Sequence, residues 1–211
     1  MEIAILIYDR LTALDAIGPY EVLSRLPGAS VTFVAAAPGP VRTDVGSLAL
    51  HADRSLEELR HPDIVVVPGG PGQAALMRDE PTLAWLREAH DNAQWTASVC
   101  TGSLLLGAAG VLKDRRATTH WLALDQLAEL GAEPTSERFV FDGDVVTAAG
   151  VSAGIDMALA LVARIAGDDI ARTIQLGIEY DPQPPFDSGS PEKAPPELVE
   201  RLRAMSRFVT V

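Results

Sequence analysis

Short apolar runs rich in β-branched residues determine what this chain can fold into. They span residues 3–8, 30–36, 64–67 and 96–99, and none alternates strictly between apolar and polar side chains. Such runs are typical of strands that are covered on both faces. Segments with helical periodicity lie between them, at residues 18–25, 55–59 and 81–91. Strands that alternate with helices predict βαβ units and a doubly wound α/β sheet whose strands are mostly parallel.

The second half of the chain continues this pattern. A hairpin is expected from strands at 139–141 and 145–148, because Asp142-Gly143-Asp144 joins them as a turn. A short strand is expected at 117–119, and helices are expected at 102–110, 120–130, 154–165, 168–177 and 196–205. With 211 residues and no internal repeat, we expect a single domain over residues 1–211.

A proline-rich stretch over residues 181–196 interrupts the helices near the end of the chain. Its proline density excludes regular helix. Two interpretations stay open: an ordinary surface loop, or an interface arm or pocket rim.

Charge and composition exclude several classes of partner. Lys and Arg number 17 against 29 Asp and Glu, for a net charge of −12, and such a field repels nucleic acid and anionic lipid. The N-terminus lacks the basic start and the long apolar segment of a signal peptide, and no other apolar run is long enough to span a membrane. One cysteine allows no internal disulfide. We therefore expect a cytoplasmic protein that binds neither nucleic acid nor membranes.

The only cysteine, Cys100, lies where a buried strand ends and an apolar helix begins. A residue on such an elbow projects from the carboxyl end of the sheet, where open α/β folds bind ligands. The amino end of the following helix favours a thiolate, which predicts a lowered pKa for Cys100. Thr101 follows it directly, and Gly102 leaves room for the tight turn. The alternative is that Cys100 is a small buried apolar residue without a chemical role.

A second strand ends in Val67-Pro68-Gly69-Gly70. The backbone N–H groups of Gly69 and Gly70 can receive a developing negative charge, although the same glycines are equally consistent with a turn that needs positive φ. Neither a G-x-G-x-x-G motif nor a phosphate-binding Gly-Lys-Ser/Thr motif is present. We therefore expect no nucleotide and no other cofactor.

Several polar residues are candidates for the same site, each with a structural alternative. Asp15 lies in an apolar stretch and is either a helix cap or a carboxyl group with a raised pKa that delivers a proton. His120 is either a base for Cys100 or a histidine at a helix start. Gly150 and Ser152 either line the cleft or form a helix cap. The four histidines have no ligand spacing, so no metal site is expected.

Four motifs together resemble the PfpI-like branch of the class I glutamine-amidotransferase-like superfamily, and within it the isonitrile hydratases. They are Pro68-Gly69-Gly70, Val99-Cys100-Thr101-Gly102, Ala117-Thr118-Thr119-His120-Trp121 and Ala149-Gly150-Val151-Ser152-Ala153-Gly154. The resemblance runs through essentially the whole chain. It implies a flavodoxin-like three-layer α/β sandwich, usually a homodimer, in which the cysteine on the elbow faces an acidic residue that follows the first strand. Those roles correspond to Cys100 and Asp15.

This chain departs from the superfamily's motifs at positions that two of its activities require. Its proteases have histidine after the cysteine, where this chain has Thr101, and its amidotransferases have a glutamate two residues after the histidine, where this chain has Leu122. The chain is also similar to the N-terminal half of AraC-like transcription regulators, but its net charge of −12 disfavours DNA binding. The expected function is a cysteine-dependent hydro-lyase that adds water to a small apolar isonitrile. The alternatives are a redox-sensing dimer and a glyoxalase-like or chaperone-like member of the superfamily.

Overall fold

The computed structural model, which describes residues 1–206, contains a seven-stranded central sheet. Strands β5 (Arg54–Ser55), β2 (Ser30–Ala35), β1 (Glu2–Leu6), β6 (Ile64–Val67), β7 (Trp95–Val99) and β11 (Val145–Ala148) are parallel to their neighbours and follow one another in this order. Only β10 (Phe139–Asp142), at the edge beside β11, is antiparallel. The predicted doubly wound, mostly parallel sheet is confirmed.

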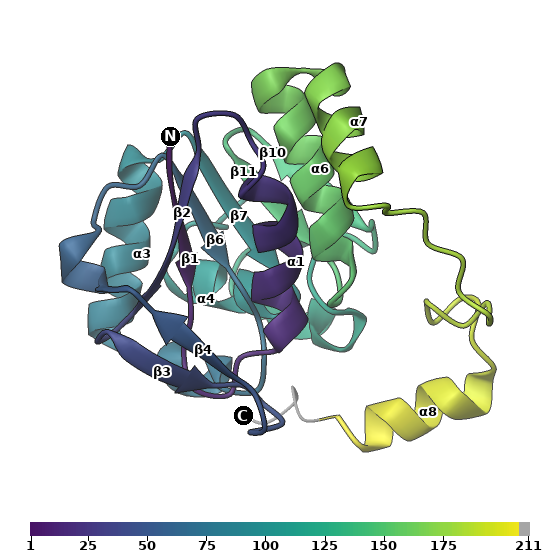
Figure 1. Ribbon diagram of the computed structural model, residues 1–211. Coiled ribbons are helices and arrows are strands. Elements are labelled where there is room, and N and C mark those ends of the chain that lie inside the picture. The colour runs from purple at the N-terminus through teal and green to yellow at the C-terminus, as the bar shows by residue number, and fades with distance from the viewer. Residues whose placement is uncertain (207–211) are drawn as a thin grey trace.

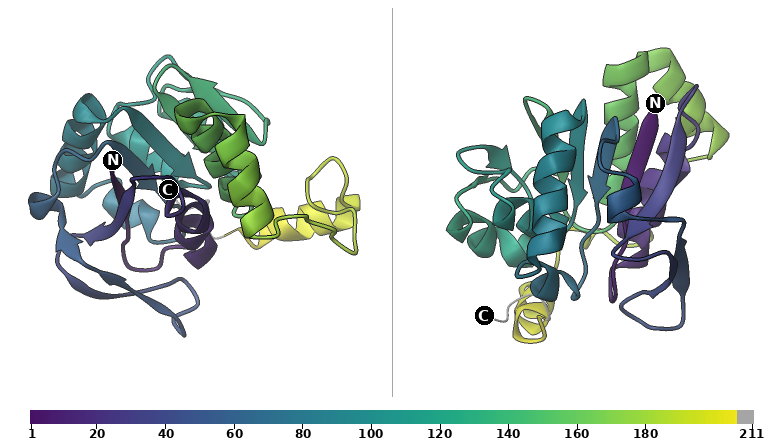
Figure 2. Two further views of the ribbon diagram at one scale, coloured as in Figure 1. Left: turned by 45° about the horizontal axis from the view of Figure 1, so that its top comes forward. Right: turned by 90° about the vertical axis from the view of Figure 1, so that its left-hand side faces the viewer.

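Helices cover both faces of this sheet and give three layers (Figures 1 and 2). One face carries α1 (Ala13–Leu23), α6 (Ala153–Ala166) and α7 (Asp168–Gly177). The other carries α2 (Gln73–Leu76), α3 (Glu80–Asn92) and α4 (Gly102–Ala108), with α5 (Leu124–Glu129) packed on α4. No helix within residues 1–206 is long and apolar enough to cross a membrane.

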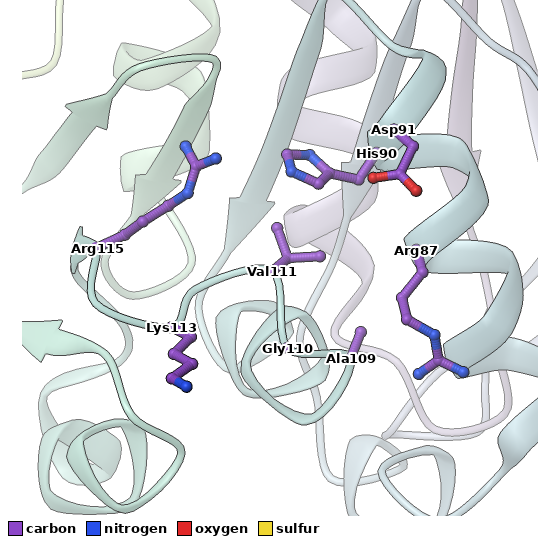
Figure 3. Close-up of a pocket in the computed structure, with 8 residues that line it drawn as sticks. All are labelled: Arg87, His90, Asp91, Ala109, Gly110, Val111, Lys113 and Arg115. Carbon is purple, nitrogen blue, oxygen red and sulfur yellow. The ribbon is translucent and has the colours of Figure 1, made fainter.

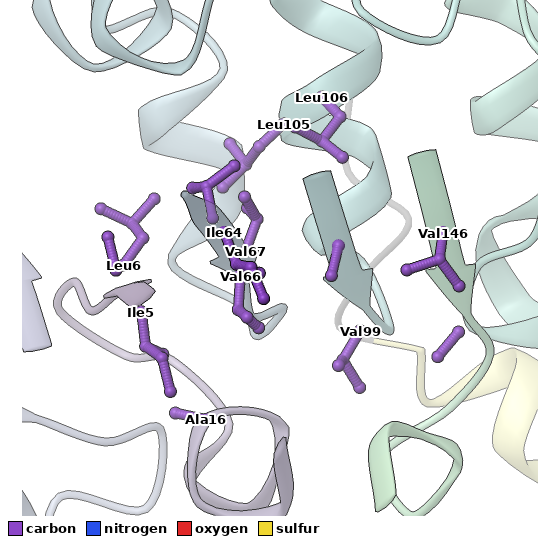
Figure 4. Close-up of a cluster of buried hydrophobic side chains, with 14 of the residues drawn as sticks. Ile5, Leu6, Ala16, Ile64, Val66, Val67, Val99, Leu105, Leu106 and Val146 are labelled. Carbon is purple, nitrogen blue, oxygen red and sulfur yellow. The ribbon is translucent and has the colours of Figure 1, made fainter. Parts of the chain in front are cut away.

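The core lies between these layers because the central strands are apolar on both sides. All four residues of β6 are fully buried, as are Ile3, Ala4 and Ile5 of β1. Figure 4 shows Ile5 pointing towards the helix that carries Ala16 and Val99 on the same side of the sheet, whereas Leu105 and Leu106 cover the opposite face. Each fully buried aliphatic side chain of this size contributes about 1.5–3 kcal/mol of transfer free energy. This core fixes the carboxyl ends of β1, β6 and β7 relative to one another.

Several boundaries differ from those expected from the sequence. The first helix was expected at 18–25 but begins at Ala13, so Asp15 lies inside it. Residues 55–59 form only a short 3-10 helix, Leu56–Glu58, and residues 120–130 divide into a 3-10 helix, Trp121–Ala123, followed by α5.

Two pairs of short strands form two small sheets that are separate from the main sheet. Strands β3 (Gly39–Arg42) and β4 (Ala49–Ala52) form an antiparallel hairpin that the sequence analysis did not predict. Strand β8 (Arg116–Ala117) pairs with β9 (Glu133–Pro134). The hairpin of β10 and β11 was predicted correctly. The loop between β3 and β4 approaches the start of α1, where Leu11 pairs with Thr43.

The proline-rich stretch contains no helix or strand over residues 181–195, as expected, and leads into α8 (Pro196–Ala204). Figure 1 shows this arm reaching away from α7 and placing α8 below the sheet. The side chain of Arg203 lies over the ring of Trp121, with 5.8 Å between the guanidinium carbon and the ring centroid. The arm thus returns to the end of the sheet where β7 meets α4.

Candidate active site

Cys100 occupies the elbow between β7 and α4 in a conformation that is unusual for a residue with a side chain. Its φ is +56°, in the left-handed region. The backbone N–H of Cys100 donates to the carbonyl oxygens of Ala148 and Ala149 at 3.0 and 2.8 Å, so the end of β11 holds the elbow. Strain of this kind is found at functional sites that the surrounding structure over-determines. The predicted elbow is confirmed.

Two glycines let the elbow and the turn after β6 approach each other closely. A Cβ atom at Gly102 would lie 2.0 Å from the carbonyl oxygen of Val67, and one at Gly69 would lie 2.5 Å from the amide nitrogen of Thr101. No side chain fits at such distances. Gly102 therefore serves the tight approach that the sequence analysis expected of it.

The turn after β6 binds the two polar neighbours of Cys100 through its backbone. The N–H of Gly69 donates to Oδ2 of Asp15 at 3.0 Å, and the N–H of Gly70 donates to Oγ1 of Thr101 at 3.0 Å. Both residues were expected as donors to a developing charge. In this structure their N–H groups are engaged by Asp15 and Thr101.

Asp15 is the third residue of α1 and is fully buried. Burial raises the pKa of its carboxyl group from 3.8 to about 7, against the opposing effects of the Gly69 N–H and the Cys100 thiol, and Asp44 adds to the increase. The residue before the helix is Thr12, so Asp15 is not its N-cap. Its Oδ1 has no hydrogen-bond partner among the described residues. The expectation of a buried carboxyl group with a raised pKa is confirmed.

The thiol of Cys100 does not have the lowered pKa that its position at a helix start predicted. It is 0% exposed, and burial raises its pKa well above the usual value, with the charge of Asp15 acting in the same direction. The backbone N–H groups of Thr101 and Val151 oppose this increase. The prediction was wrong because the desolvation of a fully enclosed sulfur outweighs the field of a seven-residue helix.

Two contributors were missed by the sequence analysis. The buried Tyr8, two residues after β1, donates from its hydroxyl group to the carbonyl oxygen of Pro68 at 2.9 Å and supports the glycine turn. Its pKa is raised by burial and by the charges of Asp15 and Cys100, which places it in the same buried group. Val151 contributes a backbone N–H that acts on the sulfur of Cys100, and nothing in its own side chain indicates this.

A cavity of about 590 Å³ opens beside the elbow. Gly150, Val151 and Thr119 belong to its lining, and the Thr119 hydroxyl donates to the Cys100 carbonyl oxygen at 3.0 Å. The remaining walls come from the segment around the 3-10 helix Trp121–Ala123, from the residues before β10, from the start of α6, from the arm and from α8. They comprise Thr118, His120, Trp121, Leu124, Ser136, Arg138, Ala149, Ser152, Gly189, Ser190, Pro191, Glu192 and Arg203. The arm therefore forms part of the rim of a pocket.

His120 begins the 3-10 helix and lines this cavity. Its Nδ1 accepts a hydrogen bond from the N–H of Leu122 at 3.2 Å, and burial lowers its pKa to about 4. The ring is therefore neutral with its proton on Nε2, which makes it a hydrogen-bond donor. The alternative of a histidine at a helix start describes this arrangement better than a base for Cys100 does.

Gly150 and Ser152 flank Val151 at the cavity. A Cβ atom at Gly150 would lie 3.0 Å from Cδ2 of His120, so glycine lets the imidazole ring pack there. Ser152 precedes α6 but makes no cap hydrogen bond, and its hydroxyl oxygen accepts from Arg138 at 3.4 Å. Both residues line the cleft.

A second cavity, of about 390 Å³, lies at the other end of β7, where His90 contacts the hydroxyl group of Thr96. In Figure 3 its basic side chains start from well-separated parts of the chain, and Arg115 points upward whereas Lys113 and Arg87 point downward. They do not converge on one ligand position. The site near Cys100 is therefore the better candidate for chemistry.

Comparisons with known proteins agree with this geometry. The model of the DJ-1/PfpI family matches residues 1–164. The chain is 45% identical over 203 residues to the isonitrile hydratase of Pseudomonas putida, which covers 96% of this chain and 89% of that protein. It is 37% identical over 136 residues to the transcriptional regulator CdhR of Pseudomonas aeruginosa, which covers 63% of this chain and 40% of the regulator.

The solved structures include a THiJ/PfpI family protein from Pseudomonas syringae with a TM-score of 0.94 and 39% identity. The match covers 97% of this chain and 85% of that one. The sheet order, the cysteine elbow and these matches lead to one assignment: the chain belongs to the DJ-1/PfpI family.

Proposed function

We propose that this protein is an isonitrile hydratase, a lyase that adds water to R–N≡C and releases the formamide R–NH–CHO. The observation that carries the proposal is the buried pair of Cys100 and Asp15, in which the carboxyl group has a pKa of about 7. The 45% identity to a named isonitrile hydratase over 96% of the chain supports it. An acid that is protonated near neutral pH suits this substrate, because the terminal carbon of an isonitrile becomes electrophilic when it is protonated.

The first step joins the substrate to the enzyme. Asp15 gives its proton to the terminal carbon while Sγ of Cys100 forms a bond to the same carbon, and the thiol proton passes to the Asp15 carboxylate. The product is a thioimidate, R–N=CH–S–Cys, and Asp15 is protonated again. The raised pKa of the thiol is compatible with this step, since the proton is transferred as the bond forms and no free thiolate is needed.

The second step releases the product. Water adds to the thioimidate carbon, and a proton is delivered to the nitrogen. The carbon–sulfur bond then breaks, the formamide leaves, and the sulfur recovers its proton. The N–H groups of Thr101 and Val151, which act on the sulfur of Cys100, are suited to stabilise the negative charge that develops there. The Thr101 hydroxyl, held by Gly70, can orient the water.

The cavity beside the elbow accommodates the R group. Trp121, Leu124 and Pro191 supply apolar surface, in keeping with a neutral substrate. Cys100 itself is 0% exposed beneath the lining formed by Thr119, Gly150 and Val151. The proposal therefore requires this lining to open when the substrate binds, and the slender, linear isonitrile group needs little room.

The burial of Cys100 also bears on the redox-sensing alternative. Sensor cysteines are exposed and have a low pKa, because oxidants react with the thiolate. The thiol of Cys100 is enclosed and its pKa is raised. This observation favours hydration over redox sensing.

The test uses the purified protein and cyclohexyl isocyanide, with formation of N-cyclohexylformamide followed by proton NMR. We expect turnover by the native protein and none by Cys100→Ala, which retains the fold because alanine fits a site where the thiol is enclosed. The matched control is Ser206→Ala, a substitution outside the elbow and the cavity lining. Turnover by Cys100→Ala within about tenfold of the native rate would exclude nucleophilic catalysis.

A further inference from the structure

The N-cap residue of α1, Thr12, does not use its side chain to cap the helix. Thr12 precedes the helix in an extended conformation suited to an N-cap, yet its side chain makes no hydrogen bond to the first turn. Its hydroxyl group instead donates to Oδ2 of Asp44 at 3.4 Å. A favourable cap interaction, usually about 1 kcal/mol, is replaced by a contact with a carboxylate.

Asp44 comes from the loop between β3 and β4, and backbone contacts hold it in place. Its N–H donates to the carbonyl oxygen of Leu11 at 2.8 Å, and Leu11 pairs with Thr43. The N–H of Arg10 donates to the carbonyl oxygen of Arg42 at 2.8 Å, which extends the attachment. The position of the Asp44 carboxylate at the start of α1 is therefore built into the fold.

This position brings Asp44 close to Asp15. The backbone N–H of Thr12 donates to the carbonyl oxygen of Gly69 at 2.9 Å, and the N–H of the same glycine donates to Oδ2 of Asp15 at 3.0 Å, so Asp15 and the residue that Asp44 contacts meet at one glycine. The backbone N–H of Asp15 donates to the Thr12 carbonyl oxygen at 3.1 Å. Asp44 is half-buried, and within residues 1–206 it forms no ion pair that would neutralise its charge.

The groups around Asp15 act in opposite directions. The amino end of α1 and the Gly69 N–H favour its ionised form. Burial and the charge of Asp44 favour its protonated form. From β1 and the elbow it faces Tyr8 and Cys100, both neutral when protonated, while α6 packs on α1 through Ile155.

We propose that Asp44 is a positioning residue that keeps the proton on Asp15 at neutral pH and thereby sets the upper pH limit of the reaction. The effect of Asp44 on Asp15 is inferred from the structure alone, whereas its consequence for turnover rests on the proposed function. The hairpin that carries Asp44 thus takes part in the chemistry without touching the substrate.

The variant Asp44→Asn tests this directly, because asparagine removes the charge and keeps an oxygen that accepts from Thr12. The carboxyl carbon of Asp15 is titrated by carbon-13 NMR, and the pH profile of cyclohexyl isocyanide hydration is recorded. We expect the pKa of Asp15 to fall by about one unit, the usual effect of removing a nearby like charge. The alkaline limb of the rate profile should move to lower pH by the same amount, so the rate at pH 7 should be roughly fivefold lower than that of the native protein.

The matched control is Asp53→Asn, which removes the same charge from an exposed site just after β4 and should leave the Asp15 titration unchanged. An Asp15 titration that is the same in Asp44→Asn and in the native protein overturns the inference, as does an equal shift in the control. If the titration shifts as expected while no protein hydrates the isonitrile, the effect of Asp44 on Asp15 stands and the proposed function fails. If the native protein turns over but the Asp44→Asn profile does not move, the inference fails and the proposed function stands.

Discussion

Replacing Asp15 by Asn should make the stability of this protein less dependent on pH. The Asp15 pKa is raised from 3.8 to about 7 in the folded protein, so between these values the folded state holds a proton that the unfolded chain releases. The free energy of unfolding of the native protein therefore falls as the pH rises through this window. At about 1.36 kcal/mol per pH unit, the part lost between pH 5 and pH 7 is roughly 2.5 kcal/mol, and about 4 kcal/mol is lost over the full window.

Asp15→Asn removes this pH-dependent part of the free energy of unfolding but also destabilises the folded protein. The amide oxygen can still accept from Gly69, whereas the new NH₂ group is buried where Oδ1 now has no partner, at a cost of about 1–3 kcal/mol. The variant should therefore differ in stability from the native protein by no more than about 1.5 kcal/mol at pH 5 and should be more stable than the native protein at pH 8. Guanidinium unfolding at pH 5, 6, 7 and 8 measures the difference. A stability difference that stays constant across these pH values would refute the assignment of a raised pKa to Asp15.

Three further outcomes follow from the geometry. Iodoacetamide should alkylate Cys100 more slowly at pH 7 than it alkylates the thiol of glutathione, because Cys100 is enclosed and its pKa is raised. Asp15→Asn should accelerate the alkylation of Cys100 at pH 8. Alkylation of the native protein that is faster than that of glutathione would contradict this account. Gly102→Ala should either fail to fold or have a melting temperature far below that of the native protein, because its Cβ would lie 2.0 Å from a carbonyl oxygen of β6. Gly177→Ala is the control: no atom lies within 4 Å of the position of its Cβ, so it should melt near the native temperature. Thr101→Val should lower the free energy of unfolding by about 1–3 kcal/mol in denaturant titrations, since it leaves a buried N–H of the glycine turn without its acceptor; an unchanged midpoint would count against that bond.

The parts of the fold that the sequence predicted are those governed by local patterns. The central strands were identified because β6 and its neighbours are apolar throughout, which only a strand covered on both faces explains. The elbow at Cys100 was identified because glycine and a small polar residue follow a buried strand directly. Each of these signals lies within a few consecutive residues.

What the sequence did not predict depends on contacts between distant segments. The strands β3 and β4 are short and partly exposed, and β3 begins with Gly39-Pro40, a pair common in turns. Asp44 gains its neighbour Thr12 only when the hairpin folds back. The pKa of Cys100 was predicted from the adjacent helix, although the enclosure of the sulfur decides it. Enclosure is a property of the folded layers and has no local pattern.

The reacting pair and the cavity walls come from different parts of the chain. Asp15 and Cys100 are held by backbone groups just after β6 and at the end of β11, whereas the walls come largely from the 3-10 helix at Trp121, the start of α6 and the arm with Pro191. Substitutions in the walls can therefore change which R groups fit while the acid and the thiol keep their positions. Such a division lets related proteins diverge in substrate range by small steps that each preserve a working reaction centre.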